Sequence, residues 1–262
     1  MTMAKLSVIV LTYNEERNIE ECLASVAWAD EIIVVDSGSS DKTLERAGRH
    51  VTQIVTLPWN GYGAARNTAL SRTAGEWILW LDADERVTPE LAEEIRACVA
   101  ANDPEIAGYA VGRRAYFCGK WIRHCGWYPS RVVRLFRKSA GRFSETRVHE
   151  QLVISGKVIR CKNDLLHFTD PDLRHYFQKF NSYTTLAAED MNTAGRVFRV
   201  TDVVIRPIYQ FAKMYILRLG FLDGMHGFIV CAASSAYVFA KYAKLWELQK
   251  KGNAKENRGG NS

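Results

Sequence analysis

Four short apolar runs alternate with amphipathic segments over the first hundred residues, and this alternation constrains the fold more than any other feature. The runs occupy residues 6–12, 31–36, 53–57 and 77–81. A short apolar run that ends in turn residues is typical of a strand buried on both faces. Strands and helices in such alternation predict an α/β fold with a mostly parallel sheet flanked by helices.

The segments between the runs carry helix signals. We expect Asn14 to cap a helix with two glutamates in its first turn, because Asn is a favoured N-cap and acidic residues suit the positive end of the helix dipole. Residues 61–74 predict another helix. Thr88-Pro89 predicts the start of a further helix, with proline at its first position.

Polar residues follow the strand-like runs at their carboxyl ends. In open parallel sheets, ligands bind in the crevice outside these ends. The residues expected to face this crevice are Thr12, Asn14, Glu15, Asp36, Asp82 and Asp84. Their convergence is the clearest functional signal in the sequence.

The stretch ILWLDADERV places Asp82, Asp84 and Glu85 directly after a fully apolar run. A partly desolvated carboxylate needs a partner, so a cation is expected there. Three interpretations stay open: a solvated surface turn, the nucleophile loop of haloacid dehalogenase-class phosphatases, and a divalent-cation site that binds a nucleotide diphosphate. The phosphatase loop needs Thr or Val where Arg86 stands. Asp36 favours the cation site, because a buried acceptor there can bind a base or a ribose.

The sequence does not match two other nucleotide-binding patterns. The sequence has no GxxxxGK[ST] motif, which argues against a P-loop. Gly61-Tyr62-Gly63 begins like a dinucleotide-binding fingerprint, but Arg66 stands where the third glycine is needed, and the segment follows the wrong strand.

Charge is distributed unevenly along the 262 residues. The net charge is +6, yet residues 1–110 hold 9 Lys/Arg against 18 Asp/Glu, whereas residues 111–199 hold 17 against 7. This asymmetry predicts a cation site early in the chain and an anionic partner later. Six cysteines without a CxxC pair argue against a zinc module or a disulfide framework and suit a reducing cytosol. The N-terminal apolar run is too short for a signal peptide and is interpreted as the first strand.

From about Tyr109 the pattern changes. Residues 131–137 (RVVRLFR) and 151–160 (QLVISGKVIR) predict antiparallel strands or a hairpin. Residues 172–194 predict a helix. The second half of the chain is therefore expected to add antiparallel strands and helices to the parallel sheet.

Residues 113–147 hold ten Lys/Arg and one acidic residue, Glu145, interleaved with aromatic residues. Such a composition can indicate nucleic-acid binding. A phosphorylated sugar-lipid acceptor explains it equally well, because arginine binds phosphate groups and aromatic faces stack on sugar rings. A solvated basic face is the remaining interpretation.

Segments 203–222 and 226–248 are strongly apolar but interrupted by Lys and Arg. Neither offers a clean run of about 20 apolar residues, so a membrane-spanning helix is not expected. The composition favours helices that lie on the inner leaflet, with their basic residues near anionic headgroups. The alternative is a helical pair that packs into a core or a dimer interface.

Four segments together resemble family 2 glycosyltransferases of the GT-A fold: SVIVLTYNEE, IIVVDSGSSDKT, GYGAARNTAL and GEWILWLDADE, in that order. Later segments, RLFRKSAGRFSETRVHEQL, YILRLGFLDGMHGF and YVFAKYAK, resemble the lipopolysaccharide inner-core β-1,4-glucosyltransferases. The resemblance implies a metal-dependent inverting transferase that uses UDP-glucose, with Mg²⁺ or Mn²⁺ as cofactor and a lipid-linked saccharide as acceptor. It implies no nucleic-acid partner.

The resemblance also assigns the residues of the donor site. Thr12, Asn14 and Glu15 would line the nucleotide pocket, and Asp36 would contact uracil. Arg66 would approach the diphosphate, with a salt bridge on the helix surface as the alternative.

Metal and catalytic residues follow from the same resemblance. Asp82 would lie at the ribose or at the water shell of the metal, and Asp84 would ligate the metal. His167 would complete the metal shell or be a core histidine. An inverting transfer needs a general base for the acceptor hydroxyl. Glu150 is the candidate, with His149 as helper or alternative, and an ion pair with a nearby arginine is the competing explanation for Glu150.

The expected organisation is a GT-A domain over residues 1–200, with a nucleotide-sugar half at 1–110 and an acceptor half at 111–200. A membrane-apposed helical extension at 201–250 and a disordered tail at 251–262 would follow. The protein would be cytoplasmic and peripheral on the inner face of the cytoplasmic membrane. The alternatives are a transferase for another polysaccharide, glycolipid or protein acceptor, a sugar-nucleotide nucleotidyltransferase, and a non-catalytic membrane-bound scaffold.

Overall fold

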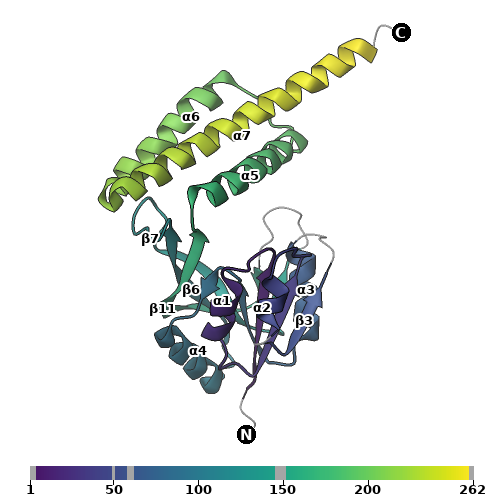
Figure 1. The fold of residues 1–262 in the computed structure, drawn as a ribbon, viewed down its shortest axis with the longest axis vertical. Coiled ribbons are helices and arrows are strands. Elements are labelled where there is room, and N and C mark those ends of the chain that lie inside the picture. Colours follow the sequence, from purple (N-terminus) through teal and green to yellow (C-terminus); the bar gives the residue numbers. More distant parts are fainter. Residues whose placement is uncertain (1–3, 49–50, 58–61, 145–151, 260–262) are drawn as a thin grey trace. The chain divides into compact units, whose positions relative to one another are not determined.

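The computed structural model describes residues 4–48, 51–57, 62–144 and 152–259 (Figure 1). The chain packs into two compact units. The sheet unit comprises Met1–Arg114 and Pro129–Phe168, and the helical unit comprises Ala115–Tyr128 and Thr169–Ser262. The chain therefore enters the helical unit twice.

The sheet unit is built on one mixed sheet with the strand order β3-β2-β1-β4-β8-β6-β11-β5. The strands β3, β2, β1 and β4 are parallel, and β8 pairs antiparallel with both β4 and β6. The strands are β1 (Leu6–Thr12), β2 (Glu31–Asp36), β3 (Gln53–Thr56), β4 (Trp77–Asp82), β5 (Glu85–Arg86), β6 (Ile106–Phe117), β8 (Ser130–Arg137) and β11 (Lys157–Asp170). This confirms the expected α/β fold with a parallel half and later antiparallel strands.

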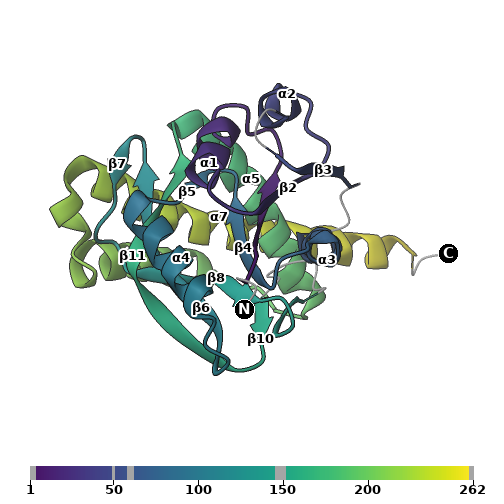
Figure 2. The same cartoon turned by 90° about the horizontal axis from the view of Figure 1, so that it is seen from below.

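The central parallel strands β1, β2 and β4 are buried over most of their length because both of their faces are covered, whereas the edge strand β3 keeps Gln53 and Thr56 exposed. Val8 and Val10 of β1 belong to a core that includes residues of α1 (Ile19–Ser25) and α4 (Pro89–Ala101). Ile9 and Leu11 belong to a second core, which includes residues of α3 (Tyr62–Arg72). Figure 2 shows α1 and α4 on one side of the parallel strands and α3 on the other. A short helix, α2 (Thr43–Ala47), lies between β2 and β3 in the chain.

The helix starts show one confirmed and one wrong prediction. Thr88 caps α4 as expected: its hydroxyl accepts the Leu91 N–H at 3.2 Å, and Pro89 is the first helical residue. Asn14 does not cap a helix, because α1 begins only at Ile19 and Asn18 is its N-cap. Asn14 has instead a left-handed backbone (φ 54°).

The segment QLVISGKVIR forms strands but not a hairpin. Within it, β10 (Leu152–Ile154) pairs antiparallel with β9 (Gly141–Phe143) in a separate two-stranded sheet. The following strand, β11, joins the main sheet instead. The Ser-Gly turn therefore separates strands of two sheets, because each strand finds its apolar partners elsewhere in the fold.

The helical unit contains a short hairpin and three long helices. The hairpin pairs β7 (Lys120–Trp121) with the end of β6. The helices and the turns between them are α5 (Leu173–Thr193), α6 (Val200–Ala212), a π-helical turn (Lys213–Leu217), a 3₁₀ turn (Gly220–Asp223) and α7 (Gly224–Gly259). Both α5 and α6 pack against α7. The helix expected at 172–194 is thus present, and the 3₁₀ turn at Gly220–Asp223 separates the two apolar segments of the C-terminal part.

The boundary between the two compact units differs from the domain boundary expected from the sequence. The helix α5 belongs to the same compact unit as α6 and α7, whereas the expected boundary lay at residue 200. The helix α7 runs to Gly259, into the range 251–262 for which the sequence predicts disorder. The nucleotide-sugar and acceptor halves stay predictions, since packing alone does not assign function to them.

Gly227 provides a test of how closely the helical unit is packed. A Cβ at this position would overlap the carbonyl oxygen of Gly220 and lie 2.9 Å from the Asp223 Cβ. Glycine to alanine inside a helix normally stabilises by about 0.5–1 kcal/mol. We expect Gly227→Ala to lower the free energy of unfolding by about 1–3 kcal/mol instead, because of overpacking. Urea unfolding followed by circular dichroism measures the change.

Gly48→Ala is the matched control. Its Cβ would meet only the Leu44 and Glu45 carbonyl oxygens, at 3.6 and 3.9 Å, and its φ of −58° is ordinary. The control should unfold like the unchanged protein or slightly later. A Gly227→Ala protein as stable as this control would contradict the close approach of the two glycines.

Candidate active site

The polar residues expected to face one crevice lie on adjacent strands. Thr12 is in register with Asp36 of β2, and Leu11 with Asp82 of β4. The carboxyl ends of β2, β1 and β4 therefore present these side chains side by side, as the sequence predicted. Thr12 is buried, and its hydroxyl oxygen has no hydrogen-bond partner among the described residues.

Asp36 is buried and organises the turn that follows β2. One carboxylate oxygen accepts the N–H groups of Gly38 and Ser39, both at 2.9 Å, and the other accepts the Ser39 hydroxyl at 2.5 Å. Asn14 joins the same turn: its N–H donates to the Ser39 hydroxyl, and its side-chain oxygen accepts the Ser40 N–H, both at 2.8 Å. The loops after β1 and β2 are thus held together. A contact from Asp36 to uracil stays a prediction.

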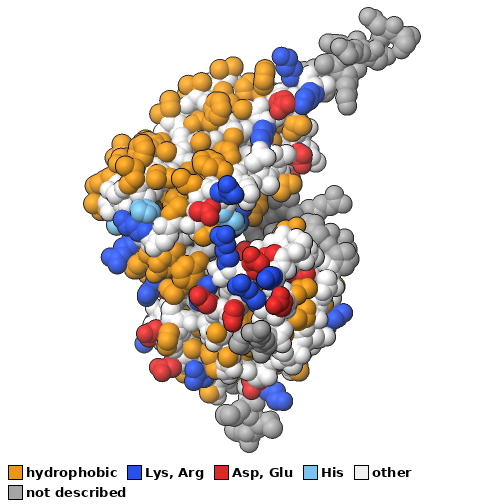
Figure 3. Space-filling view, viewed as in Figure 1, with side chains coloured by type: hydrophobic (Ala, Val, Ile, Leu, Met, Phe, Trp, Pro, Cys, Tyr) orange, Lys and Arg blue, Asp and Glu red, His pale blue; other side chains and the backbone are white. Residues whose placement is uncertain are grey.

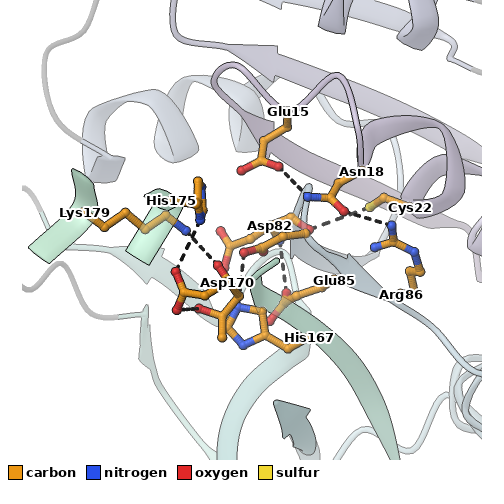
Figure 4. Close-up of polar contacts among 12 residues, drawn as sticks. Glu15, Asn18, Cys22, Asp82, Glu85, Arg86, His167, Asp170, His175 and Lys179 are labelled. Carbon is orange, nitrogen blue, oxygen red and sulfur yellow. Dashed lines mark hydrogen bonds and ion pairs between the residues drawn. The ribbon is translucent and has the colours of Figure 1, made fainter. Parts of the chain in front are cut away.

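Glu15 is linked to the other side of the site through Asn18. The Asn18 amide donates to the Glu15 carboxylate at 2.7 Å, and its oxygen accepts from Arg86 at 3.1 Å (Figure 4). The Glu15 N–H donates to the Thr43 hydroxyl at 2.8 Å. Arg86, which the phosphatase interpretation could not accommodate, therefore ties β5 to the start of α1.

Asp82 lies between two arginines at the end of β4. Its two oxygens accept from Arg66 of α3 at 3.1 Å and from Arg134 of β8 at 2.9 Å. Its side chain is 35% exposed. Burial works against the charged form, but Arg134 and Arg66 outweigh it and lower the pKa of Asp82 to about 2. Asp82 is therefore ionised near neutral pH.

Arg134 and Glu85 form a buried ion pair beneath Asp82, and neither had an assigned role from the sequence. Arg134 is 1% exposed, donates to Glu85 and lies 3.7 Å above the ring of Trp80. Glu85 is fully buried and also accepts the Asp82 N–H at 3.1 Å (Figure 4). Burial raises the pKa of Glu85 against the opposing effect of Arg134. The signal in the sequence was an arginine at a core position of the strand RVVRLFR.

Arg134 also has N–H groups for which the described residues provide no acceptor. Its Nε and Nη1 atoms are buried and have no partner among the residues that the structure describes. A buried donor without an acceptor costs about 1–3 kcal/mol. Two such donors beside an ionised carboxylate suggest that a ligand with oxygen acceptors completes this part of the site.

Asp84 and His167 face each other at 3.3 Å between Oδ2 and Nε2. The pairing of β5 with β11 brings them together, since His167 is in register with Glu85. Burial alone would lower the pKa of His167, but the neighbouring Asp84 and Glu85 raise it. Across the described ranges, no group of three or more His, Cys, Asp or Glu side chains could hold a metal ion. Asp84 supplies a carboxylate oxygen suited to Mg²⁺ or Mn²⁺, whereas the imidazole nitrogen of His167 does not suit Mg²⁺, which prefers oxygen ligands; a cation here would need further ligands from substrate or water.

Several residues of the basic stretch 113–147 pair inside the sheet unit. Arg134 binds Asp82 and Glu85, Arg114 binds Asp164 at 3.1 Å, and Arg137 binds Glu76. These arginines stabilise strands and do not form one exposed cationic surface. The catalytic candidates His149 and Glu150 lie outside the described residues.

Comparisons with known proteins identify the family. The glycosyl transferase family 2 model matches residues 7–179. The chain belongs to glycosyl transferase family 2. This range contains the residues expected for the donor site, and the protein is a glycosyltransferase.

Two relatives resemble this glycosyltransferase over nearly its whole length. The lipopolysaccharide core biosynthesis glycosyltransferase LpsC of Rhizobium meliloti is 31% identical over 249 residues, which are 92% of each chain. An uncharacterized glycosyltransferase of Rickettsia typhi is 28% identical and aligns over 95% of this chain and 89% of its own.

A solved structure shares the fold. The mannosyltransferase PcManGT of Pyrobaculum calidifontis, in complex with GDP-Man and Mn²⁺, matches with a TM-score of 0.55 at 17% identity. The match covers 94% of this chain and 88% of that one. The similarity extends beyond the parallel sheet to the C-terminal helices, and it confirms the GT-A fold.

The Arg134–Glu85 pair leads to a prediction about stability. Removing one partner of a buried ion pair leaves an uncompensated charge and typically costs about 3–5 kcal/mol. We expect Arg134→Met to lower the free energy of unfolding by about this amount. Replacing both residues, Arg134→Met with Glu85→Leu, should restore most of the loss, because no buried charge then remains unpaired.

A double-mutant cycle measured by urea unfolding tests the pairing. Arg131→Met, an exposed arginine on the same strand, is the control and should change stability by less than about 0.5 kcal/mol. Additive effects of the Arg134 and Glu85 substitutions would contradict the pairing.

Proposed function

We propose that this glycosyltransferase moves a hexose, glucose from UDP-glucose, onto a lipid-linked saccharide acceptor such as the inner core of lipopolysaccharide. The observation that carries the donor half of the proposal is the arrangement at the end of β4, where Arg66 and Arg134 flank Asp82. The acceptor half is supported by the name of the relative LpsC, a lipopolysaccharide core biosynthesis glycosyltransferase.

The donor would bind along the carboxyl ends of β1, β2 and β4. Thr12 offers a buried hydroxyl without a partner among the described residues, at the end proposed for the nucleotide. Arg134 offers two buried donor nitrogens, Nε and Nη1, whose N–H groups diphosphate oxygens or sugar hydroxyls would satisfy. Arg66 is held over the ring of Trp80 at 4.4 Å, which directs its guanidinium to the same place. Glu15, Asn14 and Asp36 would shape the nucleotide pocket through the two joined loops.

Asp84 and His167 would hold a divalent cation. When bound, such a cation stabilises the negative charge on the leaving diphosphate. Asp82 stays ionised beside them because of its two arginines, and it would orient the ribose or the water molecules of the cation. The Asp84 carboxylate suits both Mg²⁺ and Mn²⁺, and the His167 imidazole favours Mn²⁺ over Mg²⁺, because Mg²⁺ prefers oxygen ligands.

Glu150 would act as the general base. It would take the proton of the acceptor hydroxyl as that oxygen attacks the anomeric carbon and the diphosphate leaves from the opposite face, which inverts the configuration. His149 would assist Glu150 or replace it. A lipid-linked acceptor requires the enzyme to work at a membrane, so we place the protein on the inner face of the cytoplasmic membrane.

The donor site is tested by titrating UDP into the protein in the presence of Mn²⁺ and in the presence of EDTA, using calorimetry. We expect Mn²⁺-dependent binding that Asp84→Asn weakens about tenfold or more, because the variant loses an anionic metal ligand. Asp190→Asn on α5, where the aspartate is exposed, is the matched control and should bind like the unchanged protein. UDP binding that is equally strong in EDTA would refute the role of Asp84 and His167.

The catalytic role of Glu150 is tested separately from donor binding. Glu150→Gln should bind UDP normally but transfer glucose about 10²–10⁴ times more slowly, because general-base catalysis typically contributes this factor. Steady-state transfer from radiolabelled UDP-glucose to lipopolysaccharide core acceptor measures the rate. Glu189→Gln on α5 is the control. A Glu150→Gln enzyme with near-normal turnover would remove Glu150 from the mechanism and direct attention to His149.

A further inference from the structure

The turn between α6 and α7 carries large apolar side chains that face solvent. We define the apolar tip by Ile205, Ile208, Ile216, Leu217, Leu222 and Met225, which are between 56% and 71% exposed. They come from α6, the π-helical turn, the 3₁₀ turn and the first turn of α7. Figure 3 shows hydrophobic side chains gathered over this part of the helical unit.

The apolar tip is not the core of the helical unit. A separate core lies behind it, in which Met214, Val230 and Cys231 pack against Phe117 and Ile122 of the hairpin. The tip side chains remain outside although the core is filled. Soluble monomers seldom expose a contiguous apolar patch of this kind without a binding partner.

Charge around the tip has one sign. The segments that carry the tip, residues 205–225, contain three Lys/Arg (Arg206, Lys213 and Arg218) and a single acidic residue, Asp223, and Arg206 pairs with Asp202 just outside this range. Asp223 is 2% exposed, and its carboxylate accepts the His124 N–H at 2.8 Å and the Arg123 N–H at 3.3 Å. The negative charge is therefore used internally to hold the hairpin to the turn.

The hairpin adds cations next to the tip. The Lys120 amine donates to the Asp223 carbonyl at 2.7 Å, and the Cys125 N–H donates to the Arg218 carbonyl at 3.0 Å. Arg123 and Arg218 are exposed on these two segments. An apolar surface bordered by Lys and Arg matches the interface of an anionic phospholipid leaflet, where apolar side chains enter the acyl boundary and cations meet the headgroups.

A second copy of the chain fits the tip less well, because pairing two such surfaces would bring their cations together. A membrane-spanning arrangement also fits poorly. Among the residues that the structure describes, one helix, at Gly220–Lys251, is long and apolar enough to cross a bilayer. However, the Lys244 amine, toward the C-terminal end of that helix, donates to the hydroxyls of Thr184 and Thr185 on α5, which ties this part of the helix to a polar surface. The neighbouring α6 has 13 residues, about 20 Å, and with the π-helical turn that continues it reaches only about 27 Å; it is not among the candidate spans of the described residues.

We propose that the apolar tip docks the protein peripherally onto an anionic phospholipid surface, with the tip side chains in the interface and Arg218, Lys213 and Arg123 at the headgroups. The biological purpose of this docking rests on the proposed function, because a lipid-linked acceptor would be reached from the membrane surface. The docking itself requires only the helical unit.

Flotation with vesicles tests the docking. Full-length protein should float with vesicles of phosphatidylcholine and phosphatidylglycerol and much less with phosphatidylcholine alone, and 0.5 M NaCl should weaken the binding. Leu217→Asp with Met225→Asp should reduce partitioning more than tenfold, and Lys213→Glu with Arg218→Glu should abolish the preference for anionic vesicles. Val158→Asp, at an exposed valine of β11 in the sheet unit, is the control and should float normally.

Each contrary outcome excludes the proposal in a different way. Protein that stays unbound to every vesicle would overturn it. Protein that resists extraction by alkaline carbonate would show a spanning helix instead of peripheral docking. A dimer in light scattering that Leu217→Asp with Met225→Asp converts to a monomer, without an effect on flotation, would assign the tip to a second copy.

UDP calorimetry on the same proteins separates this inference from the proposed function. The tip variants should bind UDP with Mn²⁺ like the unchanged protein, because their substitutions lie outside the sheet unit. Flotation without any UDP binding would leave the docking intact and refute the donor site. UDP binding without flotation would support the donor site and refute the docking.

Discussion

The buried guanidinium of Arg134 is the interaction on which the site depends. It enters from β8, stacks on Trp80 and donates to both Asp82 and Glu85. Without this cation, the two carboxylates would be close like charges in a poorly hydrated place, and at least one would bind a proton. Arg134 therefore explains how a buried strand can end in an acidic cluster whose partly exposed member, Asp82, stays ionised.

The parallel strands and the antiparallel strands each contribute charged residues to the candidate site. The parallel half delivers Thr12, Asp36 and Asp82 to one edge. Pairing of β8 with β4 then places Arg134 below Asp82, and pairing of β5 with β11 places His167 opposite Asp84. The candidate donor site thus depends on two kinds of strand pairing, and a change in register of either β8 or β11 would separate the charged partners.

The helical unit combines a buried core with an exposed apolar surface. It has its own core around Cys231 and Val230, yet it leaves apolar side chains exposed at the turn after α6. Asp223 makes this possible: by accepting the backbone N–H groups of the hairpin, it fixes the turn while contributing no exposed negative charge. The proposed docking would restrict the search for a lipid-linked acceptor to two dimensions.

The sequence by itself determined the parallel half of the sheet. Its apolar runs are local and unambiguous, so the strand bounds and the positions of Thr12, Asp36, Asp82 and Asp84 at their carboxyl ends could be predicted. The family also followed from motifs inside these segments. The cap at Thr88 was predictable for the same reason, since capping depends on neighbours only a few residues away.

Tertiary structure alone decided which strands pair across long separations. It placed Arg134 and Glu85 in the site, sent β10 and β11 into different sheets, and gave Asn14 to the turn after β2 instead of a helix. Those outcomes depend on contacts between residues tens of positions apart, and the local pattern carries no record of such contacts.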